Sequence, residues 1–384
     1  MSAAFASIDT VRTTDTTDFA CLRVGAEVVA SGRDPYDDNT WESALPAASA
    51  DRYGNVRAAP CPGRFGYPLW TALALAPLAA LGPAAAAALW QLLFLAGAIG
   101  GTALAWAAVG GERRAWPTIA VVALASFPFW IALVLAQFGG LLVLFVAAIA
   151  YGLRARRPIA VGIAVAALAL KPHVAPIAAL VALWRGDRRA ALAAVATVVF
   201  LVIGSLVARP DWTGEWIGEA AGHRIDLAAA YPTTWALADR LFGDARLGAA
   251  LSGMCLIALW LLLRGVHVDD VGALALATSA WLTVVPYIGL HDELVLVLPW
   301  AQILAVALSS RGARRWILTG SLLACASVLP WTLQAYEHRV VGDETPSALV
   351  PIASALLLGL ALRVRGHSPS TARSSSASSN GLAR

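Results

Sequence analysis

Apolar stretches follow one another along most of the chain, from Tyr67 to Leu362, with short polar segments between them. A helix of about 20 apolar residues crosses a bilayer, and in lipid only helices and closed barrels satisfy their own backbone hydrogen bonds. The composition agrees, because 59% of the 384 residues are hydrophobic and 14% are charged, whereas soluble domains carry about 25% charged residues. The sequence therefore predicts an all-α, polytopic integral membrane protein and excludes a soluble globular enzyme.

The hydrophobic segments that we expect to be helical differ in length, and several are shorter than a full span or contain proline. Short, proline-interrupted segments are typical of half-helices that pack within protein around a polar cavity. The segments are residues 67–81, 83–109, 117–137, 140–153, 158–184, 190–207, 247–263, 271–288, 294–308, 316–333 and 347–362.

Arginines gather at the ends of these segments and predict which side of the membrane each end faces. Lys and Arg total 28, and Lys171 is the one lysine among them. Arginine at span ends marks the cytoplasmic side, rather than a nucleic-acid surface, so we expect no nucleic-acid partner. The clusters are Arg154, Arg156 and Arg157; Arg185, Arg188 and Arg189; Arg264; Arg311, Arg314 and Arg315; and Arg363 and Arg365.

This sidedness predicts two turns inside the membrane domain. Residues 158–184 must return to the face they left, turning near Lys171 and Pro172, and residues 117–153 must turn around 137–140 if Arg113 and Arg114 are cytoplasmic. The loops left outside are residues 1–66, 209–246, 287–293 and 334–346. Residues 67–109 look like two spans, whereas the scheme requires an odd number there, and the sequence leaves this open.

We divide the chain into three regions. Residues 1–66 form an extracytoplasmic loop without a signal-peptide pattern, residues 67–363 form the polytopic transmembrane domain, and residues 364–384 form a disordered cytoplasmic tail. In the first region, residues 18–31 space apolar side chains at helical intervals and predict a short amphipathic helix that ends at Gly32. Cys21 and Cys61 share this loop, and the sequence leaves open whether they form a disulfide.

Ionisable residues at apolar boundaries are the candidates for chemistry, because charge inside a membrane is costly. The first is Asp18, at the start of the predicted helix 18–31; the alternative is a charge that stabilises the helix N-terminus. The second is Lys171 with His173, which could hold a phosphate as a point charge. Its alternative is a lysine whose amine reaches the membrane interface.

Two further candidates lie in the predicted outer loops. His291, Asp292 and Glu293 follow an apolar run, and a histidine among carboxylates could stay protonated and donate to a phosphate; the alternative is a polar cap on the next helix. Residues 211–244 combine acidic and aromatic residues, and the alternative for their Trp and Tyr side chains is an interfacial belt.

Motifs for nucleotide or metal chemistry are missing from the sequence. It contains no phosphate-binding glycine loop, no paired-cysteine zinc site and no His-Glu helix motif. Asp18, Asp34, Asp37 and Asp38 could bind a divalent ion, but a solvated acidic loop is the alternative that we favour. We therefore expect neither a metal nor a nucleotide cofactor.

Several short motifs occur in a recognisable order. Asp18-Phe19, Gly32-Arg33-Asp34-Pro35-Tyr36 and Phe65-Gly66-Tyr67-Pro68 precede a segment with Pro77, and Gly162, Leu170-Lys171-Pro172 and His291-Asp292 follow. Over residues 18 to about 300 this order resembles glycosyltransferase family 87, the polyprenyl-phosphate-mannose-dependent mannosyltransferases of the GT-C type. The chain departs from the family pattern in three places: residues 1–17 supply no span before Asp18, Gln137-Phe138-Gly139-Gly140 stands where Gly-Gln is usual, and Tyr67-Pro68-Leu69 replaces Tyr-Pro-Pro.

The resemblance implies a GT-C fold with broken helices and an active site that faces outside the cytoplasm. The donor would be a sugar, mannose by this resemblance, on a polyprenyl phosphate, and the acceptor a hydroxyl of a glycolipid or glycan, with inversion at the anomeric carbon. Asp18 would be the general base, and Lys171 and His291 would lie near the donor phosphate. Further candidate substrate contacts are Tyr36, Tyr67, Gln137, His173, Asp292 and Glu293.

Two other functions fit the same sequence less well. The proline-broken helices also suit a transporter or flippase for a lipid or a small solute, but the two halves show no inverted repeat, and the ionisable groups gather at one face. A non-catalytic membrane scaffold is the third alternative. The scaffold is supported only by the lack of a predicted span before Asp18.

Overall fold

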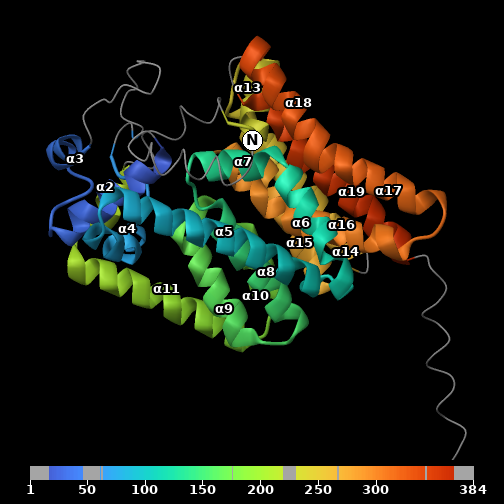
Figure 1. Ribbon diagram of the computed structural model, residues 1–384, viewed down its shortest axis with the longest axis horizontal. Coiled ribbons are helices and arrows are strands. Elements are labelled where there is room, and N and C mark those ends of the chain that lie inside the picture. The colour runs from blue at the N-terminus through green and yellow to red at the C-terminus, as the bar shows by residue number, and fades with distance from the viewer. Residues whose placement is uncertain are drawn as a thin grey trace, which may run out of the picture.

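The computed structural model describes residues 17–45, 61, 64–174, 176–218, 231–265, 268–341 and 344–366. All regular structure in these ranges is helical, with no strand, and the helices pack side by side in a bundle (Figure 1). Several predicted regions lie wholly or partly outside the described residues. They include residues 1–16 and 46–60 of the loop 1–66, residues 219–230 of the acidic and aromatic loop 211–244, and the predicted tail beyond residue 366.

Six helical stretches are long and apolar enough to cross a membrane, and the bent pair described below would supply a seventh span. The predicted all-α, multi-pass architecture is therefore confirmed. The six are α5 (Pro83–Ala108), α11 (Arg188–Ala208), Leu247–Arg264 within α14 (Leu247–Gly265), η6 (Leu290–Leu296) with α16 (Val297–Ser309), Ala313–Arg339 from α17 (Ala313–Leu323) through η7 (Ala324–Val328) and α18 (Leu329–Tyr336) into η8 (Glu337–Val341), and η9 (Thr345–Ala348) with α19 (Leu349–Gly366).

The segment predicted at residues 67–81 is not a span. It forms α4 (Leu69–Leu75) and the 3-10 turn η2 (Ala76–Ala80), which contains Pro77. Together they rise roughly 20 Å, less than the hydrocarbon thickness of about 30 Å. One span, α5, therefore remains between residues 67 and 109, so the appearance of two spans is wrong and the odd number required by the arginine scheme is present.

Both predicted turns occur. The bent pair, Arg113–Ala125 and Phe127–Val134 (α7), meets at 64°; the first part is η3 (Arg113–Ala115) with α6 (Trp116–Ala125). The chain then turns at Gln137 into α8 (Gly139–Arg154). Similarly, α9 (Pro158–Ala167) and η4 (Leu168–Leu170) stop at Lys171, and η5 (Pro172–Val174) leads into α10 (Pro176–Arg185). These breaks expose backbone and polar side chains inside the bundle.

The arginine-rich helix ends lie together at one end of the bundle. Arg154 at the end of α8 donates to the Ala108 carbonyl oxygen at the end of α5 (2.9 Å). Arg185 at the end of α10 pairs with Asp270 at the start of α15 (Asp270–Val284). At the opposite ends of α10 and α15, the Trp281 indole donates to the His173 carbonyl oxygen (2.7 Å). The breaks at Gln137 and Lys171 therefore belong to the end away from the arginines.

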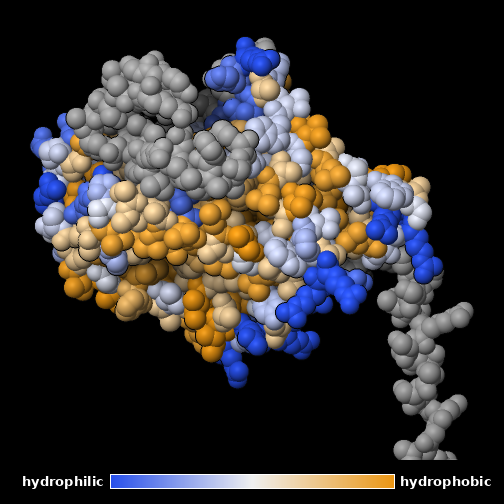
Figure 2. Space-filling view, in the orientation of Figure 1, coloured by the Kyte–Doolittle hydropathy of each residue, from blue (hydrophilic) through white to orange (hydrophobic). Residues whose placement is uncertain are grey.

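Glycines let α5 and α8 approach each other closely, as is usual for helices packed in membranes. A Cβ at Gly140 would lie 2.1 Å from the Phe94 carbonyl oxygen, and one at Gly101 would lie 2.6 Å from the Leu144 nitrogen. Other helices face outward: on α11, Phe200 is 74% and Val207 is 82% exposed. Apolar side chains cover the middle of the face in Figure 2, with hydrophilic residues at its borders. This pattern fits a lipid-facing surface.

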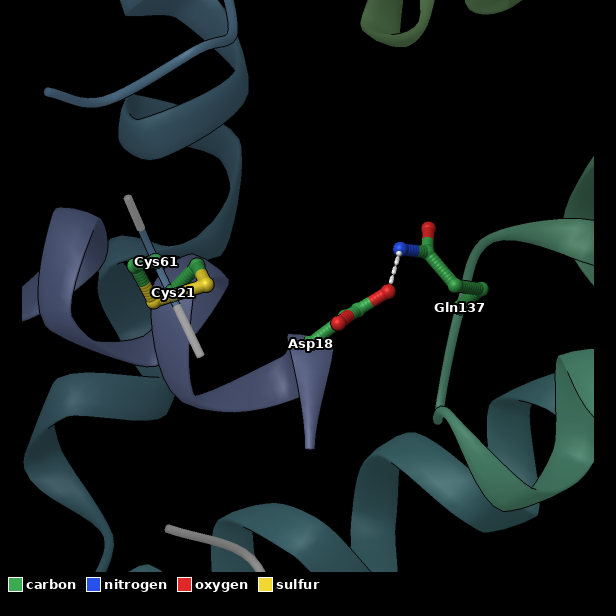
Figure 3. Close-up of a disulfide and its surroundings, with 4 residues drawn as sticks. All are labelled: Asp18, Cys21, Cys61 and Gln137. Carbon is green, nitrogen blue, oxygen red and sulfur yellow. Dashed lines mark hydrogen bonds between the residues drawn. A yellow bond between two sulfur atoms is a disulfide. The ribbon is translucent and has the colours of Figure 1, made fainter. Parts of the chain in front are cut away.

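Aromatic packing holds the N-terminal unit to the bundle, and a disulfide closes a loop within that unit. The predicted helix 18–31 is α2 (Asp18–Ala30), and Gly32 after it takes a left-handed conformation (φ 71°). The ring of Phe19 stacks on Trp90 of α5 at 5.5 Å. Cys21 and Cys61, whose pairing the sequence left open, form a disulfide (Figure 3). After α2 come α3 (Asp38–Ala44) and, between α11 and α14, α13 (Thr234–Phe242).

Candidate active site

Side chains from four separate segments meet at the end of the bundle away from the arginines. Asp18 begins α2, Gln137 lies in the α7–α8 turn, Lys171 lies in the break after η4, and Asp292 lies in η6. The Gln137 Nε2 donates to the Asp18 Oδ2 at 2.6 Å (Figure 3). The Lys171 Nζ donates to the Gln137 Oε1 at 3.4 Å. One amide thus bridges the carboxylate of Asp18 and the ammonium of Lys171.

Lys171 is held among buried groups. Its Nζ lies 2.5 Å from the Asp292 Oδ1 and 3.0 Å from the His291 Nε2. Lys171 is 2% exposed and Asp292 is fully buried. The Lys171 amine therefore points into the protein and does not reach the membrane interface. A buried charge persists when it is paired and hydrogen-bonded, and this lysine has three such contacts.

Backbone geometry explains how these side chains come so close. Ala136 has a positive φ of 52°, which turns the chain sharply before Gln137. A Cβ at Gly139 would lie 2.9 Å from the His291 carbonyl oxygen, and one at Gly289 would lie 2.3 Å from the His291 ring. The Gly289 N–H also donates to the Asp292 carboxylate (3.4 Å). The cap that we considered as an alternative role for residues 291–293 is therefore present together with the Lys171 pairing.

The Asp18 carboxyl carries an electrostatic signature of a base. Burial raises its pKa above the usual range, while the Gln137 hydrogen bond and the Lys171 charge lower it and the Asp292 charge raises it. Asp18 also lies in the first turn of α2, where its negative charge interacts favourably with the helix dipole. A carboxylate with a raised pKa is the more effective proton acceptor near neutral pH.

Aromatic rings adjoin the charged cluster. The His173 ring meets the Tyr287 ring edge-on at 5.2 Å, and its Nε2 lies 3.6 Å from the Asp292 Oδ2. Tyr231 contacts Tyr287 with ring centroids 4.3 Å apart. Burial raises the pKa of Tyr231 the most, Tyr287 raises it further, and the charges of Glu344 and Asp18 add smaller contributions. His173 and Tyr231 therefore border the same site as Asp18.

A hydrogen bond connects the side chain of Tyr36 to the backbone of Tyr67. The Tyr36 hydroxyl donates to the Tyr67 carbonyl oxygen at 2.7 Å, and Tyr36 is 1% exposed. The Tyr67 ring packs against Phe65 and against Phe138, the neighbour of Gln137. Tyr67 thus supports the α7–α8 turn from behind, whereas Tyr36 belongs to the buried core beneath α2.

Asp34, Asp37 and Asp38, the aspartates of the N-terminal loop that we considered as metal ligands together with Asp18, each have a protein partner. Asp34 pairs with Arg209 at 2.5 Å, Asp37 accepts the Thr40 N–H at the start of α3, and Asp38 pairs with Arg64 at 2.6 Å. Within the described ranges, no three His, Cys, Asp or Glu side chains are arranged to hold a metal ion. These carboxylates build the loop in this structure.

Comparison with known protein families identifies the family of this chain. The sequence model of glycosyltransferase family 87 matches residues 65–299, more than half of the chain. The chain belongs to glycosyltransferase family 87. No curated protein matches it. The match contains Gln137, Lys171, His291 and Asp292, and Asp18 precedes it.

Two acidic residues of this family 87 glycosyltransferase are not among the candidates that the sequence suggested. Glu337 and Glu344 flank the short connection between α18 and η9, and both lie near Glu293, whose side chain is 1% exposed. Residues 334–346 were assigned to an outer loop, but nothing in their spacing distinguishes a buried carboxylate from a solvated one. The signal that could have found them is the position of two glutamates directly between apolar segments.

Proposed function

We propose that this family 87 glycosyltransferase transfers a hexose, mannose by its family resemblance, from a polyprenyl phosphate to a hydroxyl group of a glycolipid or glycan. The observation that carries the proposal is the Asp18–Gln137–Lys171 bridge, which holds a base and a buried cation one amide apart. Transfer of a glycosyl group needs both: a base for the acceptor hydroxyl and positive charge for the departing phosphate.

Asp18 would act on the acceptor. The acceptor oxygen attacks the anomeric carbon, its proton passes to the Asp18 carboxylate, and the bond from the anomeric carbon to the phosphate oxygen breaks with its electron pair leaving on the phosphate. Attack opposite that bond inverts the anomeric centre. Gln137 would fix the orientation of the carboxylate, because its amide nitrogen donates to one of the two oxygens.

Lys171 would act on the donor. Its contact with Gln137, at 3.4 Å, is longer than its contacts with Asp292 and His291, so a phosphate oxygen would compete first for that N–H. His291 and His173 would border the phosphate on the other side. The leaving group is already a phosphate, so the chemistry as proposed requires neither a nucleotide nor a metal ion, and the lipid-linked sugar phosphate is the co-substrate.

The disulfide supports an extracytoplasmic position for this end of the protein. Disulfides persist in oxidising compartments and are rare in the cytosol, and Cys21 lies one helical turn from Asp18. The arginine-rich ends lie at the opposite side of the bundle, as the positive-inside rule requires for a cytoplasmic face. Residues 1–66 would then be an outer loop, residues 67–363 the membrane domain, and the prenyl tail would lie among membrane lipids.

The decisive experiment measures sugar transfer by the full-length protein in membranes. Labelled polyprenyl-phosphate mannose is supplied with a membrane glycolipid fraction as acceptor. We expect Asp18→Asn to leave expression unchanged and to lower transfer by about 10²-fold or more. The matched control is Asp38→Asn, an exposed aspartate of α3, which should keep wild-type transfer. Unchanged transfer by Asp18→Asn removes Asp18 from the mechanism, and donor-independent solute uptake would favour a transporter.

A further inference from the structure

Three carboxyl groups lie together behind the His291–Asp292 turn. Glu293 belongs to η6, Glu337 begins η8, and Glu344 immediately precedes η9. The charges of Glu337 and Glu344 both act on Glu293. Glu293 is 1% and Glu337 is 3% exposed. Glu293 is a candidate substrate contact by sequence, whereas Glu337 and Glu344 are not, and the proposed transfer reaction uses none of the three.

Hydrogen bonds link this cluster of three carboxyl groups to the turn that carries His291 and Asp292. The Glu337 Oε1 accepts the Ser347 N–H at 2.6 Å, which fixes η9 against the end of α18. Glu344 accepts the backbone N–H of Leu290, the residue before His291. The second oxygen of Glu344 and both oxygens of Glu293 are buried without a hydrogen-bond partner in the described part of the chain. Glu344 is therefore the physical connection between the cluster and the active-site turn.

The cluster cannot carry three full negative charges at low cost. Buried carboxylates that lie close together repel one another, and some keep their protons. Glu344 lies in the loop outside the spans, and its pKa is raised to about 7, first by burial and then by the charge of Glu337. Near neutral pH, a substantial fraction of Glu344 is thus uncharged.

The charge on Glu344 matters to the active site because the site already contains an excess of carboxylates. In the described part of the chain, the charge of the Lys171 ammonium acts on both Asp18 and Asp292. Glu344 lies close enough to Asp18 and Asp292 for their charges to act on it. An anionic phosphate arriving beside Lys171 adds one more negative charge. Ionised Glu344 would oppose that phosphate, whereas neutral Glu344 would not.

We propose that Glu344 is a positioning residue that holds the His291–Asp292 turn through the Leu290 N–H and that, in its uncharged form, admits an anionic lipid phosphate beside Lys171. The identity of the donor in this statement rests on the proposed function. The role of Glu344 follows from its own contacts: one oxygen fixes the turn, and the ionisation of the group sets the charge that the phosphate meets.

Other ionisable groups surround the same turn, and a test must separate their titration from that of Glu344. Those acting on it or on its cluster come from η6, η8, α2 and the segment before α13; the remaining ones lie on the helices packed against η9. The first set is Asp292, Glu293, Glu337, Asp18 and Tyr231, together with His338 and Arg339 of η8, and the second is Asp239, Arg240, Tyr336 and Arg363.

The test is binding of a polyprenyl phosphomannose to the purified full-length protein in lipid nanodiscs, measured between pH 6 and pH 8.5. This phosphodiester keeps one charge throughout that range. We expect wild-type affinity to fall about tenfold as the pH rises through the Glu344 pKa, which is the effect of two unit charges roughly 12 Å apart at an effective dielectric constant of about 20. Glu344→Gln stays uncharged while its amide oxygen can accept the Leu290 N–H, so its affinity should not fall.

Two further variants complete the test. Glu344→Ala loses the acceptor for Leu290 and should bind more weakly than wild type at every pH. Glu42→Gln, which changes an exposed glutamate of α3, should show the wild-type curve. Uncharged polyprenol, used as the second probe, should bind without pH dependence.

The outcomes separate the two proposals. If Glu344→Gln and wild type lose affinity in parallel as the pH rises, Glu344 does not govern admission of the phosphate, and the inference is wrong while the donor assignment stands. If wild type binds the phosphodiester no better than polyprenol at any pH, the proposed donor is wrong, and the inference fails with it. A curve that is flat only in Glu344→Gln supports the inference.

Discussion

Asp18 and Gln137 are 119 positions apart in the chain, yet the Gln137 side-chain amide donates a 2.6 Å hydrogen bond to the Asp18 carboxylate. The oxygen of the same amide accepts from Lys171. This arrangement keeps Asp18 from pairing directly with the lysine. A direct ion pair would lower the pKa of Asp18 further, so the intervening amide keeps that pKa higher than a direct contact with Lys171 would.

Replacing the bridging amide by a carboxylate should shift the pH profile of transfer. In Gln137→Glu, a like charge beside Asp18 raises the pKa of Asp18, so the acid limb of kcat/KM moves to higher pH. Asn39→Asp makes the same chemical change at an exposed position of α3 and should leave the profile in place. An unshifted acid limb in Gln137→Glu would show that the group titrating in that limb is not Asp18.

Removing the buried ammonium should cost both stability and activity. Lys171→Met leaves the fully buried Asp292 without its cation, which we expect to destabilise the fold by about 3–5 kcal/mol. The double variant Lys171→Met with Asp292→Leu should recover most of that loss without recovering transfer, because the positive charge for the phosphate is still missing. Thermal unfolding in detergent and transfer assays measure the two effects.

The control for this pair is the partly exposed ion pair of Arg185 and Asp270. Arg185→Met should cost about 1 kcal/mol or less, because exposed pairs are screened by solvent, and transfer should remain near wild type. A loss in Lys171→Met no larger than the loss in Arg185→Met would contradict the description of Lys171 as a buried, essential cation.

Opening the disulfide should loosen the helix that carries Asp18. Cys21→Ser with Cys61→Ser removes a link that spans 40 positions, and we expect a loss of about 2–4 kcal/mol in unfolding free energy together with reduced transfer. Cys255→Ser, at a free and partly buried cysteine of α14, is the matched control and should be nearly silent. If wild-type protein is as active and stable in strong reductant as without it, the disulfide does not support the site.

The close contact of α5 and α8 should reject any side chain at Gly140. In Gly140→Ala, the new Cβ would lie 2.1 Å from the Phe94 carbonyl oxygen, a backbone atom that cannot move aside cheaply, so we expect a loss of about 1–3 kcal/mol or more. Gly204→Ala on α11 meets nothing within 4 Å and should stabilise its helix slightly, because alanine is the better helix former. Equal unfolding temperatures for the two variants would refute the close packing.

Local patterns predicted the parts of this fold that depend on local physics. Helix α2, the break at Lys171 and the turn at Gln137 follow from apolar spacing, from proline and glycine, and from arginine sidedness. The segment 67–81 was misread because hydrophobicity alone does not measure length along the membrane normal: Pro77 and the tight η2 turn shorten it. Glu337 and Glu344 were missed because burial depends on which helices pack around a residue.

The sequence by itself determined that this chain crosses a membrane in several helices, where those helices break, and which ionisable residues sit at the breaks, since each of these depends on neighbours within a few positions. Only the tertiary structure decided that Lys171 pairs with Asp292, that Gln137 lies between Lys171 and Asp18, and that Glu344 holds the turn before His291. Those contacts join segments more than 30 positions apart, and their geometry is set by helix packing, which no local pattern encodes.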